Sequence, residues 1–155
     1  MSTSTQQSHA AAPAARRVDM LLEHYGQSHQ HPVNEAIHLL AIPLIMLSLV
    51  GLLFSLHPYV AYAFVLASMV YYARLSVVFF VAMLAVSALA LALVQLMGEA
   101  RLAWSAGIFV GAWALQFVGH RLEGKKPSFF EDLQYLWVGP LFVLSKLFNK
   151  LAIRW

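Results

Sequence analysis

A long run of residues without a charged side chain constrains this chain more than any other feature. It extends over 36–73, and further uncharged runs cover 75–98 and 102–120. A helix needs roughly 20 apolar residues to cross a membrane, so the first run fits two crossings with a turn at His57-Pro58. Only 11% of the residues are charged, against about 25% in a typical soluble domain. The sequence therefore predicts an all-α, polytopic membrane protein.

The predicted architecture is a bundle of four transmembrane helices with one additional helix at its C-terminal end. Within 133–155, a short uncharged stretch is followed by basic residues spaced four apart, which share one face of a helix. We expect this interfacial segment to be amphipathic or re-entrant. The four crossings are expected at about 37–56, 59–73, 75–98 and 102–120.

The N-terminal part of the chain is expected to lie outside the bundle. Residues 1–15 are mostly Ser, Thr, Gln and Ala, and they are predicted to form a disordered tail. Arg17–Tyr25 is expected to form a short helix at the membrane surface. Residues 16–155 are interpreted as a single membrane-embedded domain.

The basic residues predict the orientation of the four crossings. If both termini lie on one side, that side receives every Lys and Arg except Arg101. Basic residues concentrate in cytoplasmic loops, so both termini are predicted to be cytoplasmic, in a bacterial inner membrane or the endoplasmic reticulum. The basic residues punctuate apolar runs and form no stripe, so nucleic acid is not expected as a partner. The basic residues on the cytoplasmic side are Arg16, Arg17, Arg74, Arg121, Lys125, Lys126, Lys146, Lys150 and Arg154.

Histidines gather just before the first predicted crossing. His29 and His38 would lie on opposite faces of an unbroken helix, but Pro32 suits the first turn of a new helix with His31 at its cap. The chain can then bend between His29 and His38, while Asn34 shares the face of His38. Imidazole is a common metal ligand, and each ring needs a second group to orient it. A hydrogen-bonded polar cluster at the membrane interface is the alternative.

A second polar cluster closes the last predicted crossing. Gln116, His120 and Glu123 share one helix face, and Gly119 allows another backbone to approach closely. The predicted topology brings this cluster to the same side as the first one, whereas His57 lies on the opposite side. Three imidazoles with open coordination positions suit iron or zinc and suit magnesium or calcium poorly.

Both clusters carry the motifs of a known family. The spacing Tyr25-x3-His29-x4-Asn34-x3-His38, followed by Ile42-Pro43, resembles the first motif of the iron(II)-dependent 2-hydroxy fatty acid dioxygenases. The yeast member of that family acts in fatty-acid α-oxidation during phytosphingosine breakdown. The resemblance covers roughly residues 18–148, although Ser145-Lys146 replaces an expected acidic residue. The remaining matching residues are Trp113, Gln116, Phe117, Gly119, His120, Glu123 and Pro127 in the second motif, and Leu133-Gln134 and Pro140-Leu141-Phe142 in the closing segment.

The small number of histidines favours a mononuclear site, and the resemblance implies that its metal is Fe2+ and that the site carries out a reaction. Its implied iron-linked residues are His29, His38 and His120, with His24 and His31 as reserves. The implied reaction uses O2 to cleave a 2-hydroxy fatty acid between C1 and C2, with the acyl tail among the apolar helices. The residues expected to orient the ligands are Tyr25, Asn34, Gln116 and Glu123, and those expected to attract the substrate carboxylate are Arg121, Lys125 and Lys126.

Other kinds of membrane protein remain as alternatives. A non-catalytic transporter, proton relay or assembly factor would use the histidines for proton transfer or partner contacts. Transporter sites usually lie near the middle of the bilayer, whereas the polar residues here gather at one side. A zinc-dependent lipid hydrolase and a haem protein with a histidine pair are further alternatives, which metal analysis and colour would distinguish.

Overall fold

The computed structural model describes residues 16–27, 29–124 and 135–155. The predictions for residues 1–15, Lys125 and Lys126 lie outside this part of the chain. The described residues form six α-helices and no strand, which confirms the all-α prediction. The elements are α1 (Arg17–Gly26), α2 (Pro32–Leu56), α3 (Pro58–Ala73), α4 (Val77–Leu96), the 3-10 turn η1 (Gly98–Ala100), α5 (Arg101–Leu122) and α7 (Val138–Lys150).

Two His-Pro pairs start two of these helices. His31 caps α2, where its Nδ1 accepts a hydrogen bond from the backbone N–H of Val33 at 3.2 Å. His57 caps α3 in the same way, with Nδ1 accepting from the N–H of Tyr59 at 3.3 Å. Proline suits the first helical position because its missing N–H would have no partner there. The predicted cap at His31 is therefore confirmed.

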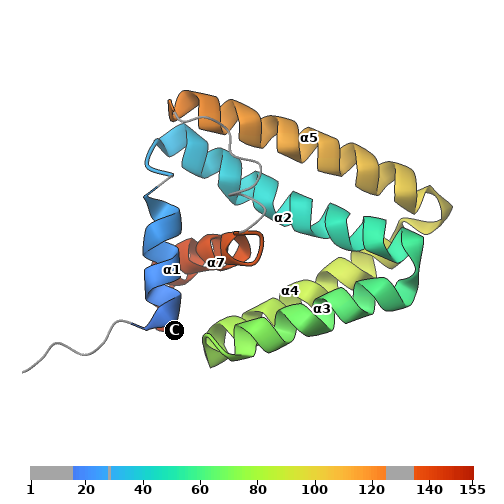
Figure 1. Ribbon diagram of the computed structural model, residues 1–155, viewed down its shortest axis with the longest axis horizontal. Helices are drawn as coiled ribbons and strands as arrows, with labels where there is room; N and C mark the ends of the chain where they lie inside the picture. The colour runs from blue at the N-terminus through green and yellow to red at the C-terminus, as the bar shows by residue number, and fades with distance from the viewer. Residues whose placement is uncertain (1–15, 28, 125–134) are drawn as a thin grey trace, which may run out of the picture.

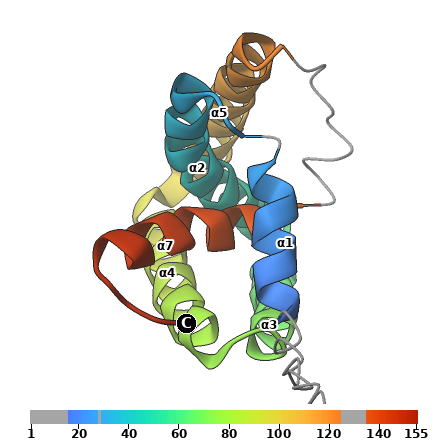
Figure 2. The same ribbon diagram turned by 90° about the vertical axis from the view of Figure 1, so that its left-hand side faces the viewer.

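The helices form two antiparallel pairs that diverge from a common end. Figure 1 shows α2 beside α5 and α3 beside α4, with the two pairs closest near the turn between α2 and α3. Figure 2 shows α7 crossing the space between the pairs at their open end, with α1 crossing one end of α7. The predicted bundle thus has an additional helix packed inside its opening.

α7 joins the surrounding helices through two apolar clusters. Leu141 is fully buried in one cluster with Val18 of α1 and Phe79 of α4. Phe142 packs in another cluster with Tyr25 and with Ile42 of α2. The stretch Val138–Phe142 is buried throughout, so α7 is part of the core. Whether α7 re-enters a membrane remains a prediction.

The α2–α5 pair is closely packed because small residues lie at both ends of its interface. A Cβ on Gly119 would come to 2.3 Å from Asn34 Oδ1, and a Cβ on Gly51 would come to 3.1 Å from Ser105 Cβ. Glycine lets two helix backbones approach where a larger side chain would separate them. This packing brings Asn34, at the start of α2, beside the end of α5.

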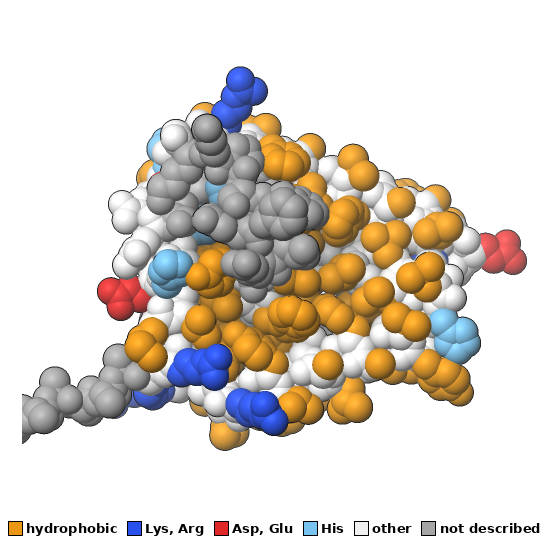
Figure 3. Space-filling view, viewed as in Figure 1, with side chains coloured by type: hydrophobic (Ala, Val, Ile, Leu, Met, Phe, Trp, Pro, Cys, Tyr) orange, Lys and Arg blue, Asp and Glu red, His pale blue; other side chains and the backbone are white. Residues whose placement is uncertain are grey.

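Three helices are long and apolar enough to cross a membrane, which indicates a membrane protein. They are α2, α4 and Gly98–Leu122, whereas α3 is apolar but has only 16 residues. Large hydrophobic side chains such as Leu66 and Leu89 are 67% and 61% exposed, as expected where lipid replaces water. Figure 3 shows hydrophobic side chains over much of one face. The count of four crossings remains a prediction.

Reporter fusions at the turns test the topology. We expect fusions at Ser55, Arg74, Gly98 and Lys126 to report outside, inside, outside and inside, because basic residues stay in the cytoplasm. Alkaline phosphatase and green fluorescent protein serve as reporters, since each is active on one side only. A fusion at Lys126 that reports the outside contradicts both the four crossings and a cytoplasmic site.

Candidate metal centre

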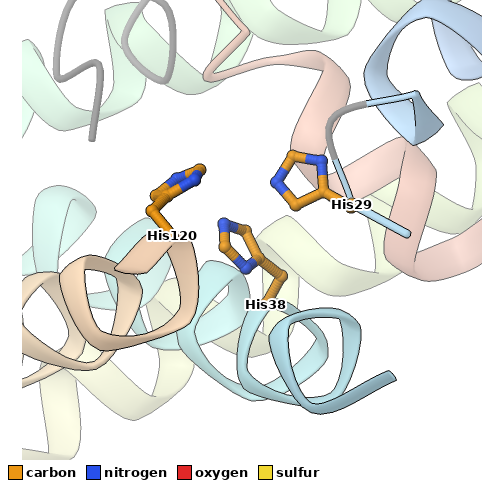
Figure 4. A group of neighbouring side chains, drawn as sticks. All are labelled: His29, His38 and His120. Atoms are coloured by element: carbon orange, nitrogen blue, oxygen red, sulfur yellow. The ribbon is translucent and has the colours of Figure 1, made fainter. Parts of the chain in front are cut away.

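Three histidines that are distant in the sequence meet where α2 begins and α5 ends. His29, His38 and His120 each offer a ring nitrogen, and these atoms all lie within 4.8 Å of one another. The ring centroids of His38 lie 4.2 Å from His29 and 4.9 Å from His120. Figure 4 shows the three rings facing a common space from three different segments.

Each histidine is held by a different part of the fold. His29 lies in the link between α1 and α2, where its N–H donates to the Gly26 carbonyl at 3.0 Å and its ring stacks on Tyr25 at 4.3 Å. His38 lies in the second turn of α2, and His120 lies in the last turn of α5. Their exposed fractions are 4%, 0% and 6%, so water has little access to the cluster.

Backbone carbonyls fix the tautomer of two rings. His29 Nδ1 lies 2.8 Å from the Tyr25 carbonyl oxygen, and His38 Nδ1 lies 3.0 Å from the Asn34 carbonyl oxygen. A carbonyl can only accept, so each Nδ1 carries the hydrogen and each Nε2 keeps its lone pair. This arrangement is typical of metal-binding histidines, whose second ring nitrogen donates to a carbonyl or carboxylate.

The Glu123 carboxylate ties the end of α5 to the start of α2. It accepts hydrogen bonds from the backbone N–H groups of Gln30 and His31, both at 2.9 Å, and from Asn34 Nδ2 at 2.9 Å. Burial raises the pKa of the Glu123 carboxyl, but these hydrogen bonds outweigh it and lower the pKa below its ordinary value. The positive end of the α2 dipole also favours a carboxylate there.

The donor set fits a divalent transition metal. Neutral imidazoles are suitable ligands for iron and zinc, whereas magnesium and calcium require oxygen ligands. Two of the rings already hold their lone pairs on Nε2, and the nitrogen atoms are close enough to converge on one ion. Three protein ligands would leave coordination positions for other molecules, as in catalytic metal sites.

Comparison with known families agrees with this geometry. A family model described as 2-hydroxy-palmitic acid dioxygenase Mpo1-like matches residues 15–151. The chain belongs to the Mpo1-like family. This match confirms the resemblance seen in the sequence motifs, and the description of the family indicates dioxygenase activity on a 2-hydroxy fatty acid. No curated protein and no solved structure gives a significant match.

Four residues expected to orient the ligands lie next to the histidine cluster of this Mpo1-like chain. Tyr25 and Asn34 each supply the carbonyl for one ring. Glu123 holds the side chain of Asn34 at 2.9 Å. Gln116 is buried one turn before His120 and lines a small pocket together with Tyr25. Their roles at a metal remain predictions.

The other predicted residues do not belong to the three-histidine group. His24 is exposed and its ring lies 5.5 Å from Tyr135, while His31 is exposed and caps α2. Arg121 follows His120 directly and its side chain is exposed at the end of α5. His57 follows the last residue of α2 and caps α3. It therefore lies at the opposite end of α2 from His38, as the sequence predicts.

Part of α7 contacts the Mpo1-like site, although no role at the site was predicted for it. The Phe142 ring lies 5.9 Å from the His29 ring and 5.1 Å from Tyr25. Lys146 pairs with Glu35 of α2 at 3.0 Å, and its Nζ lies 5.0 Å above the Phe142 ring. The motif Pro140-Leu141-Phe142 was the only signal for this contact. Lys146, in the Ser145-Lys146 pair that replaces an expected acidic residue, thus has an acidic partner on α2.

Proposed function

We propose that this protein is an iron(II)-dependent dioxygenase that shortens 2-hydroxy fatty acids by one carbon. The observation that carries the proposal is the buried group of three histidine nitrogens within 4.8 Å of one another, in a chain of the Mpo1-like family. The product is the fatty acid lacking C1. The substrate acid and the membrane lipid are the expected partners, together with O2.

The balance of this reaction requires no additional reductant. The bond between C1 and C2 breaks, C1 leaves as CO2, and C2 becomes the carboxyl carbon of the shorter acid. The electrons lost by C1 and C2 reduce O2. The oxygen atoms of O2 end in the products, which include water. The reaction therefore needs only the acid, O2 and a redox-active metal.

His29, His38 and His120 are the residues that would hold the iron. Iron(II) bound there supplies redox chemistry with O2 and open positions for the substrate. Tyr25 and Asn34 orient two of the rings through their carbonyls, and the buried surroundings keep water from the site. Fixed ring orientations hold the three donors in place before the metal and the acid bind.

Positive charge near the site would bind the substrate carboxylate. Arg121 directly follows His120 and has an exposed side chain, so its guanidinium can meet an acid that approaches from the membrane boundary. The predicted helpers Lys125 and Lys126 lie outside the described residues. Arginine suits this role because its planar group can donate two parallel hydrogen bonds to a carboxylate.

A panel of acids of equal chain length tests the reaction. We expect only the 2-hydroxy acid to give O2 uptake and the acid one carbon shorter, because the 3-hydroxy and unsubstituted acids lack an oxygen in the position needed beside the carboxylate. The iron-loaded protein is incubated with each acid, and products are identified by mass. Equal turnover of all three acids, or ester hydrolysis without O2 uptake, contradicts the proposal.

A further inference from the structure

A large pocket lies between α2, α4 and α7, in the opening between the two helix pairs. Its volume is about 330 Å³, within the range of about 300–1,000 Å³ of small-molecule sites. Every residue that lines it is apolar, including Ile42 and Met46 of α2, Met83 and Leu93 of α4, and Val143 of α7. A polar ligand would lose its hydrogen bonds to water there without replacing them.

A second, smaller pocket lies between this space and the residues beside the histidines. It is lined by Tyr25, whose ring stacks on His29, and by Gln116, one turn before His120. Ile42 and Met46 line both pockets, so the two spaces adjoin at these side chains. Gly139 makes room at this point, because a Cβ there would lie 3.3 Å from Ile42 Cδ1.

The large pocket is elongated and closed at its far end. α4 lines it from Met83 to Leu93, a rise of about 15 Å at 1.5 Å per residue. Beyond Leu93, Val94 is buried against Val50 and Ala61 where the helix pairs converge. The pocket is therefore closed where α2 and α4 converge, whereas its side along Leu89 is open.

We propose that this pocket binds the acyl tail of the 2-hydroxy acid, an inference that rests on the proposed function. The α4 residues near the closed end of the pocket then limit the length of the acyl chain. The carboxyl end then lies at the histidines and the tail passes Ile42 and Met46. Leu89 and Leu93 are 61% and 39% exposed on a helix suited to crossing a membrane. The pocket thus opens toward lipid, and the acid enters it sideways from the bilayer.

Pocket filling tests the limit on chain length. Each added methylene is expected to raise kcat/KM up to about fourfold until the tail reaches the closed end. Ala90 lines the pocket, so Ala90→Phe should lower kcat/KM for the longest acids by more than about tenfold, as two displaced methylenes would. Short acids should be unaffected.

Ala88→Phe is the matched control, because Ala88 is exposed on the same helix and does not line the pocket. Identical profiles for the two variants, or a loss at every length, contradict the proposal.

Photolabelling supplies a readout that does not depend on turnover. A 2-hydroxy-palmitic acid with a diazirine at its methyl end should label the wild-type protein between Leu89 and Leu93, and unlabelled 2-hydroxy acid should compete. Labelling spread over the outer face, or equal competition by a phospholipid, would show that the pocket holds bulk membrane lipid and would overturn the proposal. Labelling in the pocket without turnover would refute the proposed reaction alone. Turnover with labelling elsewhere would refute the acyl pocket alone.

Discussion

Replacing His38 or His120 with alanine is expected to remove iron binding and O2 uptake together. Each substitution deletes one of three buried nitrogen donors that lie within 4.8 Å of one another. Outer partners of a metal ligand typically change affinity or activity 10–100-fold, and loss of a ligand itself should exceed that range. Iron per protein molecule is measured by mass spectrometry after anaerobic loading, and activity is measured with a 2-hydroxy acid.

His57→Ala is the matched control for this pair. His57 is exposed and caps α3, so its loss should leave iron content and activity unchanged. Circular dichroism of all three variants checks that the helices remain folded. Full iron occupancy in the His120→Ala protein removes that residue from the proposed site, and retained activity without iron refutes the iron mechanism.

Glu123→Gln is expected to lower iron affinity by about 10–100-fold, the effect typical of a partner that orients a ligand. The carboxylate accepts from the backbone of Gln30 and His31 and from Asn34 Nδ2. An amide retains only one acceptor oxygen and no charge, so these contacts weaken. Both His29 and His38 are then expected to be held less firmly. His29 lies beside Gln30 in the chain, and His38 donates to the carbonyl of Asn34.

Iron titration followed by fluorescence or competition with a chelator measures this change. Glu99→Gln is the control, because Glu99 is exposed in η1 at the opposite end of α5. Its iron affinity should match that of the wild type. A wild-type affinity in the Glu123→Gln protein would show that the carboxylate only joins the helix ends and has no influence on the histidines.

The sequence predicted the helices well because their ends depend on local chemistry. Charged residues and two His-Pro pairs interrupt the apolar runs, and α2, α3 and α5 begin or end within a few residues of these signals. The approach of His29 to His38 also followed from a local feature, the break at Pro32. The proximity of His120 to these two histidines could be predicted only by assuming that successive helices run in opposite directions. The antiparallel packing of α2 and α5 agrees with this assumption.

The position of α7 could not be predicted from its own residues. The basic residues in its second half, with Lys146 and Lys150, indicated an amphipathic or re-entrant segment. Its first half, Val138–Phe142, is buried where the two helix pairs diverge. That divergence arises from packing between distant segments, and no local pattern in α7 encodes it. The ion pair of Lys146 could not be predicted for the same reason, because its partner Glu35 lies on α2.

The location of α7 between the helix pairs also determines when the site can be completed during synthesis. α7 follows all the other helices in the chain, so the ribosome releases it only after His29, His38 and His120 have been made. Until then the Phe142 ring is missing beside His29, and the wall formed by Pro140 and Val143 is missing from the apolar pocket. A nascent chain can therefore insert its long helices with an open, unfinished centre.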